Sequence, residues 1–208
     1  MKRNRTYTTV VLLALAMTTT RTQADRNTVD DQDATRVPLT PSQRQPIVLD
    51  LDGVHVILDL DKGLAIVEGF GVAETPRATN SLFRLISSHE DIKQIIIRRA
   101  YIQDGALRHL SGLPRLKAFA LAQTNVSDAM LRDLADIEGL EEISVNGGLL
   151  TDRSVLTFGQ MHRLRSLSLT RLPFLPISVN ERLNILLPHT KLNLDDADDI
   201  GGDDRTDS

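Results

Sequence analysis

The sequence contains no cysteine and no tryptophan, and only 3% of its 208 residues are aromatic. The lack of cysteine excludes disulfides, thiolate zinc sites, cysteine nucleophiles and cysteine-linked lipids. No uninterrupted apolar run approaches the ~18 residues that a membrane-spanning helix requires. The length fits one domain of ordinary size with additional segments at its ends.

A short apolar run near the N-terminus predicts export. The run VVLLALAM at residues 10–17 follows three basic residues within MKRNR. It is too short to span a bilayer, but it suits the apolar region of a secretory signal, and Thr22 and Ala24 are small enough for positions −3 and −1 of a signal peptidase site. We therefore expect a signal peptide over residues 1–24 and a protein that is periplasmic, cell-surface or extracellular. The alternative is a disordered basic tail with an apolar patch.

Negative charge is concentrated at the C-terminus. The formal net charge is −4, and it becomes −8 without the four basic residues of segment 1–24. Residues 195–208 hold seven Asp and one Arg, so the remainder is nearly neutral and lacks the basic surface that nucleic-acid binding requires. We expect a disordered acidic tail and no nucleic-acid partner. The tail matches a calcium loop poorly, with Ile200 at position five and Asp instead of Glu at position twelve, which leaves only weak cation binding open.

The folded part is expected to begin near Ile47. Residues 25–46 are polar, contain three prolines and lack periodicity, which is typical of a disordered linker. From Val54 the apolar residues alternate, a turn DKG follows, and the alternation resumes at Leu64. This pattern predicts a β-hairpin. We expect the hairpin and a following helix, over residues 47–91, to cap the N-terminal end of the fold.

A 24-residue period follows. The segments IKQIII, LKAFAL, LEEISV and LRSLSL start at residues 92, 116, 140 and 164, and each is apolar at its first, fourth and sixth positions. Further columns repeat with the same period: Ile102, Val126, Leu150 and Phe174; Asp104, Asp128 and Asp152; Leu107, Leu131 and Val155. Each unit reads as a strand followed by a short helix. Stacked units of this kind bury a continuous core that one unit alone cannot.

These units resemble leucine-rich repeats. The stretch LKAFALAQTNVSDAMLRDL at 116–134 follows the bacterial pattern L-x-x-L-x-L-x-x-T-x-(V/I)-(S/T)-D-x-x-L-x-x-L closely, and the unit length lies within the family range of 20–29. The resemblance covers residues 92–194. It implies an α/β leucine-rich repeat solenoid, a horseshoe arc with parallel strands on the concave face. It does not specify a function, because such repeats serve many tasks.

Two regions depart from this pattern. The position of Thr124 is held by Ala100 and Gly148 in neighbouring units. In the fourth unit Pro173 and Pro176 replace the residues expected to cap a helix, so we expect its helical segment to be distorted. A last short strand at 192–194 is expected one residue out of register.

The pair Ser127 and Asp128 could be a nucleophile with its acid or part of a helix start. A catalytic pair requires a positioned base and occurs once in a chain. Here the Asp recurs in successive units, and Gln103 and Thr151 take the place of the Ser. We therefore interpret both residues as belonging to helix N-termini, where a capping side chain and a first-turn carboxylate are favourable. The sequence leaves open which of the two caps.

No other set of residues predicts catalysis, a metal or a cofactor. The five histidines have no ligand spacing: His55, His89, His109, His162 and His189. The glycines of GFG at 69–71 and NGG at 146–148 lack the lysine of a phosphate-binding loop and are interpreted as turns. We therefore expect no enzyme and no cofactor.

The strand positions between the apolar residues are the candidate binding site. In a repeat of this kind they point away from the core, on the concave side. They form three columns: Gln94, Ala118, Glu142 and Ser166; Ile96, Ala120, Ser144 and Ser168; Arg98, Ala122, Asn146 and Thr170. Arg98, Arg99 and Arg171 are expected along one edge. Small, mostly uncharged side chains suit a protein or peptide ligand better than a phosphate-rich one.

The sequence thus favours a non-catalytic protein-binding module that uses the concave face. A self-assembling structural component of the cell envelope or surface is the alternative. A hydrolase of envelope polymers is less favoured, because no catalytic set was found. It also remains open that the face is only solvated and binds nothing.

Overall fold

The computed structural model describes residues 45–70, 76–176 and 178–194. The expected signal peptide, the expected acidic tail and all but the last two residues of the expected linker lie outside these ranges. Among the residues that are described, no helix is both long and apolar enough to cross a membrane.

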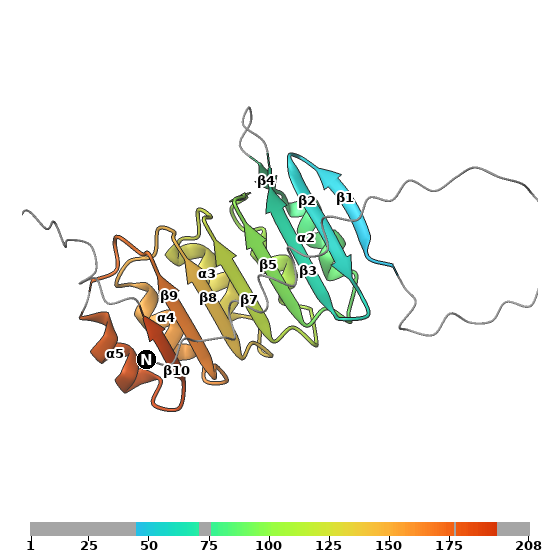
Figure 1. The fold of residues 1–208 in the computed structure, drawn as a ribbon. Coiled ribbons are helices and arrows are strands. Elements are labelled where there is room, and N and C mark those ends of the chain that lie inside the picture. Colours follow the sequence, from blue (N-terminus) through green and yellow to red (C-terminus); the bar gives the residue numbers. More distant parts are fainter. Residues whose placement is uncertain (1–44, 71–75, 177, 195–208) are drawn as a thin grey trace, which may run out of the picture. The chain divides into compact units, whose positions relative to one another are not determined.

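Eight strands form one sheet, in the order β1-β2-β3-β5-β7-β8-β9-β10 (Figure 1). Pairing is antiparallel from β1 to β3 and parallel from β3 to β10. The prediction of an α/β fold with a parallel sheet is confirmed. The strands are β1 (Ile47–Leu51), β2 (Val54–Asp59), β3 (Leu64–Gly69), β5 (Gln94–Arg98), β7 (Ala118–Ala122), β8 (Glu142–Asn146), β9 (Ser166–Thr170) and β10 (Lys191–Leu194).

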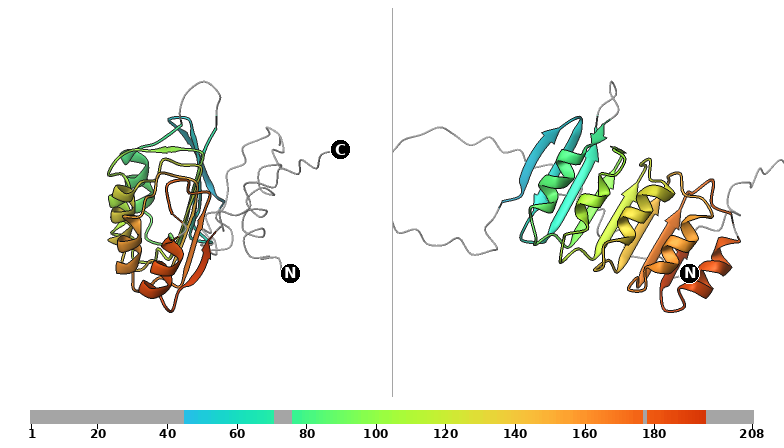
Figure 2. Two further views of the ribbon diagram at one scale, coloured as in Figure 1. Left: turned by 90° about the vertical axis from the view of Figure 1, so that its left-hand side faces the viewer. Right: turned by 180° about the vertical axis from the view of Figure 1, so that it is seen from behind.

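The helices lie together on one face of this sheet, so the domain has two layers (Figure 2). They are α2 (Asn80–Ser87), α3 (Asp128–Ala135), α4 (Ser154–Gln160) and α5 (Val179–Leu186), with the short 3-10 helix η2 (Leu107–Leu110) in the same layer. Two further strands, β4 (Arg77–Ala78) and β6 (Tyr101–Ile102), form a separate two-stranded parallel sheet.

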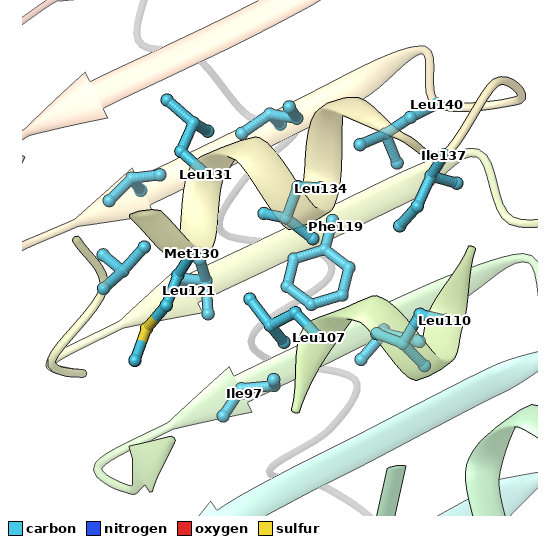
Figure 3. Packing of buried hydrophobic residues seen from close by; sticks show 14 of the residues in the cluster. Ile97, Leu107, Leu110, Phe119, Leu121, Met130, Leu131, Leu134, Ile137 and Leu140 are labelled. Atoms are coloured by element: carbon cyan, nitrogen blue, oxygen red, sulfur yellow. The ribbon is translucent and has the colours of Figure 1, made fainter. Parts of the chain in front are cut away.

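One continuous apolar core fills the space between the two layers. Alternate residues of each parallel strand point into it, as Ile95 and Ile97 do in β5. The helices contribute residues that are three or four positions apart, such as Leu131 and Leu134 in α3. Figure 3 shows the ring of Phe119 between Leu107 and Leu134. The repeat period therefore brings the buried strand and helix residues of successive units together in one core.

The expected hairpin is confirmed, but the structure adds a strand before it. Strand β2 pairs with β3 through a turn in which Gly63 has φ +66°. A Cβ at this glycine would lie 2.5 Å from the carbonyl oxygen of Asp91, and the Gly63 carbonyl accepts hydrogen bonds from Lys93 and Gln94. Glycine is needed here for both the backbone angle and the close approach. The hairpin thus does more than cap, because β3 is also the first of the parallel strands.

Gly69 was interpreted from sequence as a turn residue, but it is the last residue of β3. A Cβ at this position would lie 1.9 Å from the carbonyl oxygen of Arg99. The glycine therefore allows the end of β3 to approach the chain just after β5. Gly147 and Gly148, which were also interpreted as turn residues, do lie where the chain turns after β8, with φ +76° and +142°.

The last unit is longer by one residue, as the sequence predicted. Strand β10 pairs with β9 so that Leu192 lies opposite Leu167, one position beyond the regular repeat. The buried Val179 still stands one regular repeat after Val155, so the additional residue lies within or after α5. Helix α5 begins only after Pro173 and Pro176, and no side chain caps it.

Candidate binding face of the sheet

The sheet face opposite the helices carries the predicted binding residues. No helix among the described residues covers it (Figure 2), and we call it the open face. Its side chains alternate with core residues along each strand: in β7, Ala118, Ala120 and Ala122 are half-buried, whereas Phe119 and Leu121 are buried. Strand periodicity therefore settles which side chains face outward.

The pairing register confirms the three predicted columns. From β5 to β9 each strand pairs with the next at an offset of one regular repeat, as Ala120 does with Ser144. All twelve predicted residues lie on the open face. Each predicted column forms a row of side chains that runs across the strands, and we call these sets rows. One of them is not available to a partner: Ser168 is only 4% exposed, and its hydroxyl accepts a hydrogen bond from the side-chain amide of Asn193 at 3.0 Å.

The open face extends past the predicted residues onto β3 and β2. Ile66 pairs with Ile96, and Ile57 pairs with Ile66, so the middle row continues without a break. This row is aliphatic from β2 to β7 and polar on β8 and β9, with Ser144 and Ser168. The alternation in HVILD and LAIVEG contained this information, but β3 was predicted as a cap and not as a member of the parallel sheet.

Two arginines at the end of β5 pair with one carboxylate of β3. One Nη atom of Arg98 lies 2.8 Å from Glu68 Oε2, and Arg99 pairs with the other oxygen of the same carboxylate. Two of the three arginines expected along the edge therefore share one counter-charge. Arg171 follows β9 in the position equivalent to Arg99, and both have a positive φ, 54° and 51°.

Of the pair Ser127 and Asp128, it is Ser127 that caps helix α3. Its hydroxyl accepts from the N–H of Met130, and Asp128 is the first residue of the helix. The Asp128 carboxylate reaches the next unit, where it accepts from the N–H of Thr151 at 2.9 Å and from its hydroxyl at 2.6 Å. These two residues therefore start a helix and join two units.

The same prediction was wrong for the neighbouring units. Gln103 does not cap η2, since its side-chain oxygen accepts from the N–H of Asn80 in the preceding unit. Thr151 is not the cap of α4, which follows Arg153 without a side-chain cap. Neither Asp104 nor Asp152 is a first-turn residue. Both helices start later than the repeat predicts, which separates the polar residues from the helix N-terminus.

Asn125 joins two units and was missed. Its Oδ1 accepts from the N–H of Ile102 at 2.7 Å, and its Nδ2 donates to the carbonyl of Ile102 at 3.0 Å. The side chain therefore replaces a strand partner for both polar groups of a buried residue. Equivalent positions hold Tyr101 and Leu149. Periodicity gave no signal for this role, because it occurs in one unit only.

Charged side chains stack at the start of the strands. Glu141, just before β8, pairs with Lys117 through one carboxylate oxygen, and its other oxygen lies 3.4 Å from Arg165 Nε. The hydrogen bond from Lys117, opposed by burial and reinforced by the charge of Arg165, holds the pKa of Glu141 below its usual value. The carboxylate form is therefore favoured in the folded protein.

Lys117→Gln should make the stability of the fold less sensitive to acid. A lowered folded-state pKa stabilises the fold above the unfolded value of about 4.3, and the effect is lost as the pH falls further. We therefore expect Lys117→Gln to be less stable than the parent at pH 7, with a difference that disappears near about pH 3. Denaturant unfolding across this range measures it. Lys93→Gln is the control, because Lys93 makes no ion pair among the described residues.

The histidines show no ligand arrangement where the structure describes them. Within residues 45–70, 76–176 and 178–194, no three His, Cys, Asp or Glu side chains are placed to hold a metal ion. His55 has a carboxylate partner, with Nδ1 2.5 Å from Asp50 Oδ1, and its ring meets Phe70 edge to face at 5.8 Å. Asp50 and His55 lie on the same row of the open face as Glu68.

Comparison with known proteins gives distant structural likenesses and no sequence relative. No family model and no curated protein matches the sequence. Among solved structures, an internalin from Listeria monocytogenes aligns with 65% of this chain at 19% sequence identity and a TM-score of 0.36. The aligned part is 48% of that chain, so the present chain spans about half the length of the internalin. At this level of similarity no family is assigned.

Proposed function

We propose that this chain is a leucine-rich repeat solenoid that binds a protein or peptide through its open face, without catalysing a reaction. The fold supports the repeat assignment, because strands β5, β7, β8 and β9 succeed each other at one constant spacing and with an unbroken register. Between consecutive parallel strands the chain passes through a helical segment on the helix side and then re-enters the same sheet as the next strand. The likeness to the leucine-rich repeat pattern over 116–134 is the reason for naming this family.

The single observation that carries the binding proposal is the open face of β5 to β9. Eight strands form this sheet, and the helices of the described residues lie on its opposite side (Figure 2). Ala118, Ala120 and Ala122 at its centre allow a partner chain to approach the backbone closely. Ser144 and Asn146 on the next strand offer hydrogen-bonding groups beside them. An apolar centre with a polar border is the usual composition of a protein interface.

The location of the protein is part of the same proposal. Residues 1–24 have the composition of a secretory signal, and residues 25–46 have that of a flexible linker. A binding face on an exported domain would meet partners outside the cytoplasm. The acidic residues of 195–208 would keep such a domain soluble.

Ala120→Arg combined with Ser144→Arg should abolish partner binding. These side chains are neighbours on adjacent strands, with Ala120 opposite Ser144, and both are half-buried. Two large cations there would block close approach and would remain unpaired in the complex, which costs roughly 2–5 kcal/mol and lowers affinity by about 30- to 5,000-fold. The parent and the variant are crosslinked in the native cells, and the co-purifying proteins are quantified by mass spectrometry.

A matched variant places the same charge on the other side of the domain. Gln160→Arg with Ile185→Arg adds two arginines to exposed positions of α4 and α5. We expect this variant to retain the partner and both variants to melt near the parent temperature. Binding retained by a folded Ala120→Arg, Ser144→Arg chain would show that the open face is not the binding site.

A further inference from the structure

Among the described residues, the first strand has no pairing partner on its outer side, at one end of the sheet. β1 pairs with β2 on one side, and it is the terminal strand of the sheet (Figure 1). Such an edge presents unpaired N–H and C=O groups to which another strand can bind. Its sequence, IVLDL, contains one charged residue, Asp50. The edge therefore has few of the features that normally prevent strand addition.

The aliphatic side chains of β1 are also incompletely covered. Ile47, Leu49 and Leu51 lie on the core side of the sheet, since their partners on β2 are the buried Leu58, Val56 and Val54. Nevertheless Ile47 is 40% exposed and Leu51 is 38% exposed. They extend the core to the end of the sheet, where β2 is the only neighbouring strand within the part of the chain that the structure describes. A partner that continued the sheet would cover these side chains.

We propose that this partner is a second copy of the chain, whose β1 pairs antiparallel with this β1 about a two-fold axis at Leu49. In that register Leu49 faces Leu49 of the other copy, and Ile47 faces Leu51. Residues that face each other across antiparallel strands lie on the same side of the sheet. All three core-side pairs are therefore aliphatic, and the two cores become continuous at their exposed ends.

The strand is self-complementary in this register, as a two-fold interface requires. On the outer side Asp50 of one copy faces Val48 of the other. The two Asp50 carboxylates are therefore not directly opposite each other, and the repulsion that direct opposition would cause is avoided. Asp50 also has a counter-group within its own copy, His55 Nδ1 at 2.5 Å. Val48, which is 53% exposed, would gain a neighbour.

The other end of the sheet fits a second copy less well. β10 has four residues, and two of them, Lys191 and Asn193, are exposed and polar. Pairing of β10 with β1 of another copy would be head-to-tail and would produce an open-ended polymer. Pairing of two β1 strands closes after two copies. It also leaves the open face of β5 to β9 free, so the dimer does not depend on the proposed binding function.

A single introduced cysteine tests the register, because the chain has none of its own. In the full-length chain, Leu49→Cys places two thiols directly opposite each other, where Cα atoms are about 4.5–5.5 Å apart, within the range of a disulfide. Val48→Cys is the control, since this residue faces Asp50 and not itself. Under mild oxidation we expect a covalent dimer from Leu49→Cys, formed several-fold faster than from Val48→Cys. Equal rates would overturn the register.

Sedimentation equilibrium tests the interface without a covalent bond. Ile47→Lys and Leu51→Glu, each alone, should raise the dimer dissociation constant roughly 100-fold, because each buries two unpaired charges per dimer. A mixture of the two variants should recover a dimer, since one introduced lysine then faces one introduced glutamate. A parent chain that remains monomeric, a dimer that tolerates Ile47→Lys, or a mass that rises beyond that of a dimer as the concentration increases would each overturn the proposal.

Discussion

Phe119→Ala is expected to lower the free energy of unfolding by about 3–5 kcal/mol. The ring is 1% exposed and lies between Leu107 and Leu134, which belong to helical segments of two successive units (Figure 3). Its removal would leave a cavity that joins both units, because strand and helix positions are fixed by their neighbours and cannot collapse onto it. A loss of this size is a large share of the roughly 5–15 kcal/mol that typically stabilises a domain.

Urea denaturation followed by circular dichroism measures this loss. Leu156→Ala is the control, because Leu156 is 62% exposed on α4 and its truncation should change stability by less than about 0.5 kcal/mol. A similar small effect at Phe119 would mean that the units are not packed as described.

Asn125→Ala is expected to lower the free energy of unfolding by about 2–6 kcal/mol, although it removes only a polar side chain. Both polar backbone groups of the buried Ile102 would lose their partner, and each unsatisfied buried group costs about 1–3 kcal/mol. The loss should be measured by the same denaturation. Asn125→Asp distinguishes the two bonds, since it keeps an acceptor for the N–H of Ile102 but turns a carboxylate toward its carbonyl.

Asn184→Ala serves as the matched control for Asn125. The Asn184 amide donates to the carbonyl of Asn180 at 2.9 Å, within one turn of the exposed side of α5. We expect its loss to be close to zero, because water replaces the bond. Equal losses at Asn125 and Asn184 would contradict the role of Asn125 in joining two units.

The periodic part of the fold could be predicted from the sequence. A strand with alternate apolar residues has one buried side, and a shift by one residue would expose that side. The regular recurrence of Ile97, Leu121, Val145 and Leu169 therefore set both the register of the strands and the residues on the open face. The same argument located the one-residue shift before β10.

Features that occur once were not predictable in this way. Gln103 and Thr151 stand in the column of Ser127, but only Ser127 caps a helix, because η2 and α4 begin later. Capping depends on where the backbone turns, and three side chains of similar chemistry gave no sign of that difference. Asn125 was missed for a related reason, since its partners are backbone atoms of the preceding unit.

The extent of the candidate face was underestimated because β1 and β3 were not assigned correctly. β1 was not recognised as a separate strand, and β3 was taken for half of a cap. The spacing from β3 to β5, with Leu64 opposite Gln94, is longer than the regular repeat, so the periodicity did not detect it. Pairing between strands of unequal spacing is decided by packing, which the sequence pattern does not contain.

Crosslinking from single positions is the most direct test of the binding proposal. Because the chain lacks cysteine, a thiol-reactive photo-crosslinker can be attached at Ala120→Cys on the open face or at Gln160→Cys on α4. The two labelled chains differ only in the side of the domain that carries the probe. We predict that a partner protein is captured by the probe at position 120 and that this protein is not captured by the probe at position 160. Capture from position 160 alone, or no capture from position 120 in cells that contain the partner, would contradict the proposal.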